Sequence, residues 1–494
     1  MTRRRISAVV AVLATLAIVV PLTWMWWSSR MPDAYNVMDM GYADYGGGPR
    51  PAEGHGSHGA GATTDAGVSV EDLRGEPEGA PDVRVELVAA EGTVSLPSGR
   101  TVDGFTVNGT SPGPVVEATA GDLVEVRFRN ESVADGATLH WHGVDVPNGE
   151  DGVAGVTQDA VMPGEEFVYR FVAEDPGTYW YHSHQVSHEQ VVKGLFGALV
   201  VQPRDGVDQD VEAVAVTHTF GDRTLNGLEG DVPVVAEPGD TVRLRVVNTD
   251  NALVELWADA PYRVLAIDGF DLTGPTPVED QALTLTAGAR ADLEVTVPDT
   301  GAVRVQVGGA TSLVVGPDGV DVPPAPEQPE SDLDLLTYGT PAGLPFDVTD
   351  PDRRFDYAIG RRPGFVNGRP GLWWSINGRL FPDVPMFVVE EGDVAVFRIE
   401  NDSGESHPMH LHGHHAVVLS RNGEASTGSP WWVDSLEVAS GDEYEIAFVA
   451  DNPGVWMDHC HNLPHAKEGL VAHLMYAGVT TPYEIGPDTG NTPE

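Results

Sequence analysis

The sequence predicts an all-β protein made of three β-sandwich domains, and two observations support this. Short alternating runs of apolar and polar residues recur, such as DLVEVRFRN, TVRLRVVN and YEIAFVA, bounded by Gly, Pro, Asn and Asp. One unit also occurs three times, at 108–132, 226–250 and 377–403. Each copy has an Asn-Gly turn, a strand, a Gly-Asp turn and a second strand that ends at Asn, so each copy is expected to open a sandwich.

The length and the repeat together predict the domain organisation. At 494 residues the chain is too long for one hydrophobic core. We expect the three domains at about 81–204, 205–322 and 334–482. A Pro-rich connector at 323–333 separates the second and third domains, and a C-terminal tail covers 483–494.

The first thirty residues lie outside the predicted domains and form a signal peptide or a membrane anchor. Three arginines at 3–5 precede an apolar run over 6–27, and about 20 apolar residues suffice to cross a bilayer. Trp24, Trp26 and Trp27 lie where interfacial aromatic residues are found. We therefore expect an exported protein, either anchored on the extracellular face of the membrane or secreted.

Residues 31–80 are rich in Gly and contain few apolar residues, so a disordered linker is expected there. The chain as a whole is strongly acidic, with 28 basic and 75 acidic residues and a net charge of −47. This charge makes nucleic acid and anionic lipid poor partners for the body of the protein. A single cysteine excludes an intramolecular disulfide.

Four His-x-His pairs predict a metal cluster shared by the first and third domains. Residues i and i+2 of a strand point to the same side, so each pair presents two imidazoles together. Two pairs come from each of the two domains, which also match each other over 175–188 and 452–465. Eight imidazoles exceed the needs of one metal ion. The pairs are His140 and His142, His182 and His184, His410 and His412, and His459 and His461.

Cys460 lies between His459 and His461 and points to the opposite side of the strand. There His407 and His465 can join it, and two histidines with one thiolate are the trigonal ligand set of a blue-copper site. Zinc is the alternative metal, but a structural zinc site does not require eight further histidines nearby. Electrons that reach the thiolate can leave through the backbone into the two flanking histidines.

The motifs HWHG, HSH, HPMHLHGH and HCHNLPHAKEGL resemble the four copper-binding motifs of the three-domain multicopper oxidases, the laccase group. The resemblance extends from about residue 81 to 480. It implies three cupredoxin-like Greek-key domains and four coppers: one type 1, one type 2 and two type 3. It also implies one-electron oxidation of a small substrate at type 1 copper and four-electron reduction of O2 to water at a trinuclear cluster.

The resemblance also implies a ligand set. The type 1 ligands would be His407, Cys460 and His465, and the type 2 ligands His140 and His410. One type 3 copper would take His142, His182 and His461, and the other His184, His412 and His459.

Three further positions carry expectations. Asp151 matches the acidic residue that the family places by the cluster, so we expect a proton donor there; a turn aspartate before Gly152 is the alternative. Leu470 stands where some members have Met, and because Leu cannot ligate we expect a three-coordinate copper with a high reduction potential. Asp434 is expected to orient a type 1 histidine or to meet substrate.

The reducing substrate is predicted to be phenol-like. The alternative is a metallo-oxidase of Cu(I), Fe(II) or Mn(II): the sequence has no Met-rich insert near the type 1 motifs, which disfavours a dedicated cuprous oxidase, whereas the acidic surface favours metal ions. A copper-binding or electron-transfer protein without oxidase activity is the alternative of another class.

Overall fold

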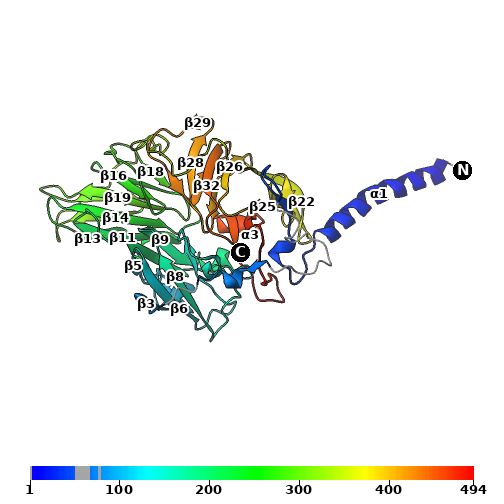
Figure 1. The fold of residues 1–494 in the computed structure, drawn as a ribbon, viewed down its shortest axis with the longest axis horizontal. Coiled ribbons are helices and arrows are strands. Elements are labelled where there is room, and N and C mark those ends of the chain that lie inside the picture. Colours follow the sequence, from blue (N-terminus) through cyan, green and yellow to red (C-terminus); the bar gives the residue numbers. More distant parts are fainter. Residues whose placement is uncertain (1–2, 51–66, 76–78) are drawn as a thin grey trace.

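The computed structural model describes residues 3–50, 67–75 and 79–494, and most of them belong to three packed β-sandwiches (Figure 1). The prediction of an all-β fold with three sandwich domains is confirmed. The boundaries of the individual domains stay a prediction. The helices of the described residues are α1 (Arg3–Ser28), α2 (Ser187–Gln190) and α3 (Leu463–Lys467), with 3-10 turns η1 (Val37–Asp39), η2 (Val70–Asp72) and η3 (Asn148–Glu150).

The first sandwich consists of two four-stranded sheets, in the orders β4-β3-β6-β8 and β5-β10-β9-β7. Strands distant in sequence lie side by side, as Greek-key connections produce. The strands are β3 (Val83–Ser95), β4 (Thr101–Val107), β5 (Val116–Thr119), β6 (Asp122–Asn130), β7 (His140–His142), β8 (Glu166–Ala173), β9 (Gly177–His182) and β10 (Phe196–Gln202).

The second sandwich has a six-stranded sheet, β12-β11-β14-β19-β16-β17, and a five-stranded sheet, β13-β21-β20-β15-β18. Its strands are β11 (Val211–Phe220), β12 (Asp222–Leu225), β13 (Asp231–Val235), β14 (Thr241–Asn248), β15 (Val254–Ala258), β16 (Arg263–Ile267), β17 (Phe270–Asp271), β18 (Leu283–Leu285), β19 (Arg290–Thr296), β20 (Val303–Val307) and β21 (Thr311–Gly316).

The third sandwich has one sheet in the order β24-β23-β22-β26-β32-β28-β29, with β30 beside β28, and one in the order β1-β25-β34-β33-β27-β31. Its strands are β22 (Arg353–Val366), β23 (Arg369–Ile376), β24 (Arg379–Leu380), β25 (Pro385–Val389), β26 (Val394–Asn401), β27 (His407–Leu411), β28 (Ala416–Arg421), β29 (Glu424–Ala425), β30 (Trp432–Val433), β31 (Ser435–Val438), β32 (Glu443–Val449), β33 (Val455–Cys460) and β34 (Val471–Tyr476).

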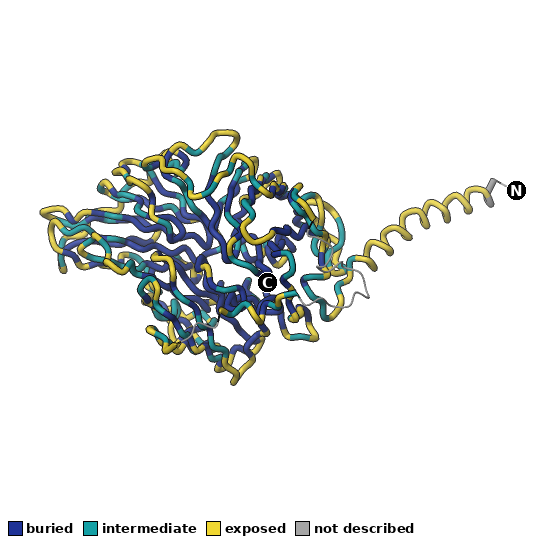
Figure 2. The backbone as a smooth tube through the Cα atoms, viewed as in Figure 1, coloured by how far each residue is buried: buried dark blue, intermediate teal, exposed yellow. Residues whose placement is uncertain are grey.

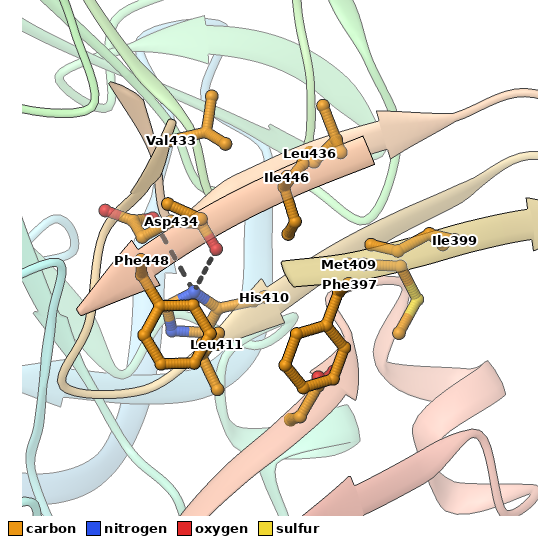
Figure 3. Close-up of a pocket in the computed structure, with 12 residues that line it drawn as sticks. Phe397, Ile399, Met409, His410, Leu411, Val433, Asp434, Leu436, Ile446 and Phe448 are labelled. Atoms are coloured by element: carbon orange, nitrogen blue, oxygen red, sulfur yellow. Dashed lines mark hydrogen bonds and ion pairs between the residues drawn. The ribbon is translucent and has the colours of Figure 1, made fainter. Parts of the chain in front are cut away.

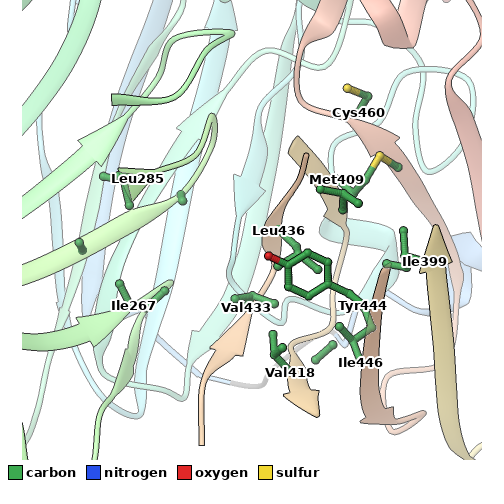
Figure 4. Packing of buried hydrophobic residues seen from close by; sticks show 14 of the residues in the cluster. Ile267, Leu285, Ile399, Met409, Val418, Val433, Leu436, Tyr444, Ile446 and Cys460 are labelled. Carbon is green, nitrogen blue, oxygen red and sulfur yellow. The ribbon is translucent and has the colours of Figure 1, made fainter. Parts of the chain in front are cut away.

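The sandwich interiors are filled by the apolar members of the alternating runs (Figure 2). In β6, for example, Val124, Val126 and Phe128 are buried at every second position. One continuous apolar core joins the second and third sandwiches, and Cys460 lies at its edge next to Met409 (Figure 4). The cysteine is thus held in packed protein rather than on a flexible loop.

The expected disordered linker over 31–80 is wrong for the parts that the structure describes. β1 (Tyr42–Asp44) adds a parallel strand to β25, and β2 (Val68–Ser69) pairs with β35 (Val479–Thr480). Val37 and Val70 are buried in the main core. Strand addition supplies backbone hydrogen bonds whatever the composition, so a segment with few apolar residues can still be held. Residues 51–66 and 76–78 of the predicted linker lie outside the described residues.

The helix α1 projects away from the sandwiches (Figure 1). Its stretch Ile6–Ser28 has 23 residues with a mean hydropathy of 2.5, and none of its strongest apolar window is buried inside the protein. This helix is long and apolar enough to cross a membrane, and it is equally compatible with a signal sequence.

Candidate metal centre

The four His-x-His pairs meet between the first and third sandwiches. In the first sandwich β7 pairs with β9 so that His140 lies opposite His182; in the third, β27 pairs with β33 so that His410 lies opposite His459. All eight imidazoles are at most 1% exposed. Rings from the two domains stack directly, with centroids 3.8 Å apart for His140 and His412. The pairing within each sheet and the contact between domains together concentrate all eight side chains.

Several triads within this group have ligand atoms that all lie within 4.8 Å of one another. They include His140, His410 and His412; His140, His142 and His182; and His184, His412 and His459. The last triad is the one that the sequence assigns to one type 3 copper. In the other predicted type 3 set, the His461 ring centroid lies 4.9 Å from that of His142 and 5.4 Å from that of His182.

A second, separate group consists of His407, Cys460 and His465. Cys460 Sγ lies 3.6 Å from His407 Nδ1 and 3.7 Å from His465 Nδ1. Cys460 and His407 are fully buried, whereas 12% of the His465 side chain is exposed. Leu470 is buried, and its carbonyl accepts a hydrogen bond from the Cys460 backbone N–H. The strand therefore places the thiol in one group and its two neighbours in the other.

Asp151 touches histidines from both domains. It follows η3, and its Oδ1 lies 3.0 Å from His140 Nδ1, while its Oδ2 lies 3.1 Å from His412 Nδ1. The carboxyl group is fully buried, and this burial raises its pKa above the ordinary value even though His140 acts in the opposite direction. A buried carboxyl beside the cluster can therefore retain a proton at a pH where an exposed aspartate would be ionised.

The expectation for Asp434 is wrong. Strand β31 pairs with β27 so that Ser435 lies opposite His410, which places Asp434 beside the eight histidines rather than near Cys460. The Asp434 carbonyl accepts from His410 Nδ1 at 2.9 Å, and Oδ1 lies 3.1 Å from His142 Nε2. Asp434 is also only 4% exposed, so it is not placed to meet a substrate.

Asp434 is held by Arg290 from β19 of the second sandwich. Arg290 is fully buried, donates to both carboxylate oxygens of Asp434 and lies 3.5 Å from Asp268 Oδ1. Its Nε also donates to the Thr178 carbonyl of the first sandwich, so one guanidinium joins all three domains. Although burial alone would raise the pKa of Asp434, Arg290 holds it well below the usual range.

Replacing Arg290 by Met should lower the free energy of unfolding by about 3–5 kcal/mol, because it removes the buried cation that the Asp268 and Asp434 carboxyl groups share. Denaturant titration of the copper-loaded protein measures the change. Arg127→Met is the control: Arg127 and Glu166 form an exposed pair, for which a loss below about 1 kcal/mol is expected. Equal losses in the two variants would contradict the role of Arg290 as the cation of this buried cluster.

His415 should make the stability depend on pH. Burial alone would lower its pKa, but the carboxylates of Asp145 and Asp434, 3.3 and 3.1 Å away, raise it to about 10. The charged imidazole therefore stabilises the fold fully below a pH of about 6.5, and that stabilisation, on the order of 5 kcal/mol, disappears as the pH rises to about 10. The melting temperature of the wild type should fall over this window. His415→Gln should show a flatter profile, and an unchanged slope would refute the assignment.

Comparison with known proteins places these groups in a family. Two family models, both described as multicopper oxidase, match residues 89–206 and 350–478. The crystal structure of Lac15 from a marine microbial metagenome is 30% identical, covers 79% of this chain and 100% of that chain, and has a TM-score of 0.58. The chain belongs to the multicopper oxidase family.

A multicopper oxidase of Pseudomonas thermotolerans is 29% identical over 80% of this chain and 99% of that chain, with a TM-score of 0.65. Multicopper oxidase MmcO of Mycobacterium tuberculosis is 27% identical over 76% of this chain and 84% of that protein.

This multicopper oxidase is a copper-dependent oxidoreductase that uses O2, which sets aside the alternative of an electron-transfer protein without oxidase activity. Its histidines fit a metal ion, because buried nitrogens such as His182 Nε2 and both nitrogens of His461 have no hydrogen-bond partner among the described residues. Burial also lowers the pKa of His182, His184 and His461 well below 6.5. Neutral imidazole is the form that binds a metal ion.

Cys460 fits the same conclusion. Burial raises the pKa of its thiol well above the ordinary value, so a thiolate at this place needs a cation next to it. A coordinated metal ion supplies that cation and deprotonates the thiol outright. Copper is the metal that two histidines and a thiolate select in a trigonal site.

No sequence pattern predicts two of the residues that support the histidine cluster. Arg290 lies in an ordinary strand of the domain that contributes no ligand, 144 residues before Asp434. Glu494 lies in the C-terminal segment, which folds back so that its Oε1 is 3.1 Å from His459 Nδ1 and its Oε2 accepts from Ser187 Oγ at 2.7 Å. Only the three-dimensional path of the chain brings these residues to the histidines.

A small cavity of about 30 Å³ lies behind His410 in the third sandwich (Figure 3). Phe397, Ile399, Met409 and Phe448 are among the apolar residues that line it, and the His410 ring with its bonds to Asp434 closes one side. This volume holds about one water molecule. The cavity is therefore too small to be the site of a reducing substrate.

Proposed function

We propose that the enzyme is a laccase-like oxidase with four coppers. His407, Cys460 and His465 would hold type 1 copper, and the eight histidines of the His-x-His pairs would hold one type 2 and two type 3 coppers. The observation that carries this proposal lies at the end of β33: Cys460 turns toward His407 and His465, while its neighbours His459 and His461 turn toward the cluster. The division of the type 3 ligands follows the sequence assignment.

Bound copper would accept electrons singly from substrate at the type 1 site and deliver them to the cluster, where four electrons reduce O2 to water. The chain connects the two sites by the shortest covalent route, from the Cys460 side chain through its backbone to His459 and His461. Asp151 would hold a proton at its carboxyl group, which lies against His140 and His412. It would give this proton to the oxygen that is being reduced. Arg290 and Asp434 would orient His142 and His410.

The geometry around His465 supports a phenol-like substrate. His465 is the partly exposed member of its group, so electrons would enter through it. The Trp374 ring lies 4.5 Å from the His465 ring, and Glu405 Oε2 lies 3.6 Å from His465 Nε2. A phenol loses a proton when it is oxidised, and the Glu405 carboxylate is placed to accept that proton.

Carboxylates at this edge favour a second candidate, oxidation of a metal ion such as Fe(II) or Mn(II). Glu468 accepts from Trp374 Nε1 at 3.0 Å, so Glu405 and Glu468 both border this edge, and carboxylate oxygens suit these harder cations better than they suit Cu(I). Oxygen uptake by copper-loaded protein with a phenol or with Fe(II) tests the two. A laccase-like enzyme turns over the phenol faster than Fe(II), and Glu405→Gln/Glu468→Gln slows the phenol reaction without abolishing it, because the proton acceptor Glu405 is lost while the route for electrons through His465 remains. Turnover of Fe(II) alone, lost in the double variant, would contradict the phenol proposal.

We also propose that α1 remains attached and anchors the enzyme on the extracellular face of the membrane. The helix carries its tryptophans at the end next to the sandwiches, as expected for an outer interface. The mass of the protein isolated from its membrane tests this directly. A mature chain that begins after residue 28 would show a cleaved signal sequence instead.

Leu470→Met should lower the reduction potential of type 1 copper, because a thioether can add a fourth, axial ligand that Leu cannot provide. Redox titration at the blue absorption band measures it. Leu463→Met is the control. Leu463 is a buried leucine on the short helix α3, and its replacement should leave the potential unchanged. An equal potential in wild type and Leu470→Met would show that Leu470 does not occupy the axial position.

A further inference from the structure

The hairpin formed by β22 and β23 differs in charge from the rest of this acidic chain. Between Tyr357 and Pro382 the sequence contains no Asp or Glu, although the whole chain has 75 acidic residues. The same stretch contains four arginines: Arg361, Arg362, Arg369 and Arg379. The hairpin is therefore a basic element on a protein with a net charge of −47.

The turn of this hairpin contacts the end of α1, as the position of β22 at the base of the helix shows (Figure 1). The Gly368 backbone N–H donates to Ser29 Oγ at 3.1 Å, and the Met31 N–H donates to Asn367 Oδ1 at 3.3 Å. A Cβ on Gly368 would lie 3.2 Å from Trp26 Nε1, so the tryptophan ring packs directly on the turn. These contacts fix the height of the turn relative to the helix.

That height coincides with the lipid headgroups if α1 spans the membrane. The apolar stretch ends at Ser28, and 23 helical residues match a hydrocarbon core of about 30 Å. Trp26 would then lie in the outer interfacial layer, where tryptophan is favoured. Because Gly368 packs on Trp26, and Gly368 and Asn367 bond to Ser29 and Met31 just beyond it, the hairpin turn lies in the same layer.

The exposed side chains beside the turn suit that layer. The register places Arg362 opposite Trp373 and Val366 opposite Arg369, so Arg362 and Arg369 lie on the same face of the hairpin. Both arginines are exposed. On the other face Leu372 is 53% exposed beside Pro363. Basic side chains with exposed apolar neighbours are what an anionic membrane surface binds.

We propose that the β22–β23 hairpin docks on anionic lipid headgroups in the outer leaflet of the membrane that α1 spans. The proposal rests on the anchoring proposed above. At the root of the hairpin Trp374 contacts the rings of His407 and His465. Six to seven residues of strand separate Trp374 from the turn, which corresponds to roughly 20 Å. Docking would therefore hold the electron-entry edge of the enzyme at that distance above the membrane surface.

Hydrogen exchange on the full-length, copper-loaded protein tests this, with one copy in each lipid nanodisc. Discs of phosphatidylglycerol are compared with discs of phosphatidylcholine. We expect amides of 361–373 to exchange about thirtyfold more slowly in the anionic discs, an effect of the size that two basic residues at a charged surface produce. Arg362→Glu/Arg369→Glu should lose this protection, and Arg362→Lys/Arg369→Lys should keep it. Arg84→Glu/Arg127→Glu, an equal charge change on exposed arginines of the first sandwich, should also keep it.

The possible results distinguish lipid docking of the hairpin from self-association and from cleavage of α1. Equal exchange in both kinds of disc, with α1 intact by mass, would overturn the docking while leaving the anchor in place. Protection that appears only when a disc holds two copies would assign the hairpin to self-association and also overturn it. Release of a shortened protein from the disc would instead refute the anchoring. Retained blue colour in each variant shows that it is folded and copper-loaded.

Discussion

Replacing Cys460 by Ser should abolish the blue colour and lower substrate oxidation by more than about a thousandfold, the scale of losing an essential member of a catalytic unit. A serine hydroxyl stays protonated and is a hard ligand, so it cannot replace the thiolate that selects copper in a trigonal site. Four coppers per chain should fall to three, because the eight histidines of the cluster do not depend on the thiol. Absorption spectra, metal analysis and oxygen uptake measure the three effects.

The first domain provides the control for that experiment. Ser183 occupies the position between His182 and His184 that Cys460 occupies between His459 and His461. Its hydroxyl donates to Gln190 Oε1 at 2.6 Å, so this side chain is used in a hydrogen bond within the first domain. Ser183→Ala should therefore retain blue colour and most of the activity. If Cys460→Ser kept its blue band, the assignment of the electron-entry site would be wrong.

The features that the sequence predicts well depend on local periodicity. Alternation with a period of two predicts strands, and the same period predicts that His459 and His461 share one side while Cys460 faces the other. The structure brings Cys460 together with His407 and His465, as that argument expects. Duplication of the unit strengthens this prediction, because the pair His140 and His142 repeats the spacing of His410 and His412.

The features that the sequence does not predict depend on long-range pairing. The segment that contains β1 is poor in apolar residues, and composition alone predicts disorder there, yet its backbone pairs with β25. Arg290 reaches Asp434 because the second sandwich packs against both the first and the third. The expectation for Asp434 fails because motif spacing does not reveal which neighbour a strand such as β31 pairs with.

Asp151→Asn should lower the turnover number by about a hundredfold to ten-thousandfold, the usual contribution of a positioned proton donor. Asn keeps the size of the side chain and an oxygen near His140 and His412, but it cannot hold the proton. The type 1 site is distant from this change, so the variant should remain blue. Under anaerobic conditions substrate should bleach it at the wild-type rate, and only the return of colour on admitting O2 should be slow.

Glu150→Gln is the matched control for Asp151→Asn. Glu150 is the adjacent buried acid, but it pairs with Arg74 at 2.9 Å and accepts from the Arg170 backbone N–H instead of touching a histidine. Burial raises the pKa of Glu150 to about 7, so a raised pKa alone does not distinguish the two acids. Glu150→Gln should affect stability and leave reoxidation fast.

The pH dependence separates a proton donor from a turn aspartate. A carboxyl group whose pKa is raised donates a proton below that pKa and fails above it, so wild-type reoxidation should slow as the pH rises through it. In Asp151→Asn the rate should be low and should lack this step. If Asp151 served only to shape the turn before Gly152, the variant would lose copper or stability while any enzyme that stayed loaded kept the wild-type profile. Contact with histidines of both domains favours the first outcome, because a turn residue needs neither contact.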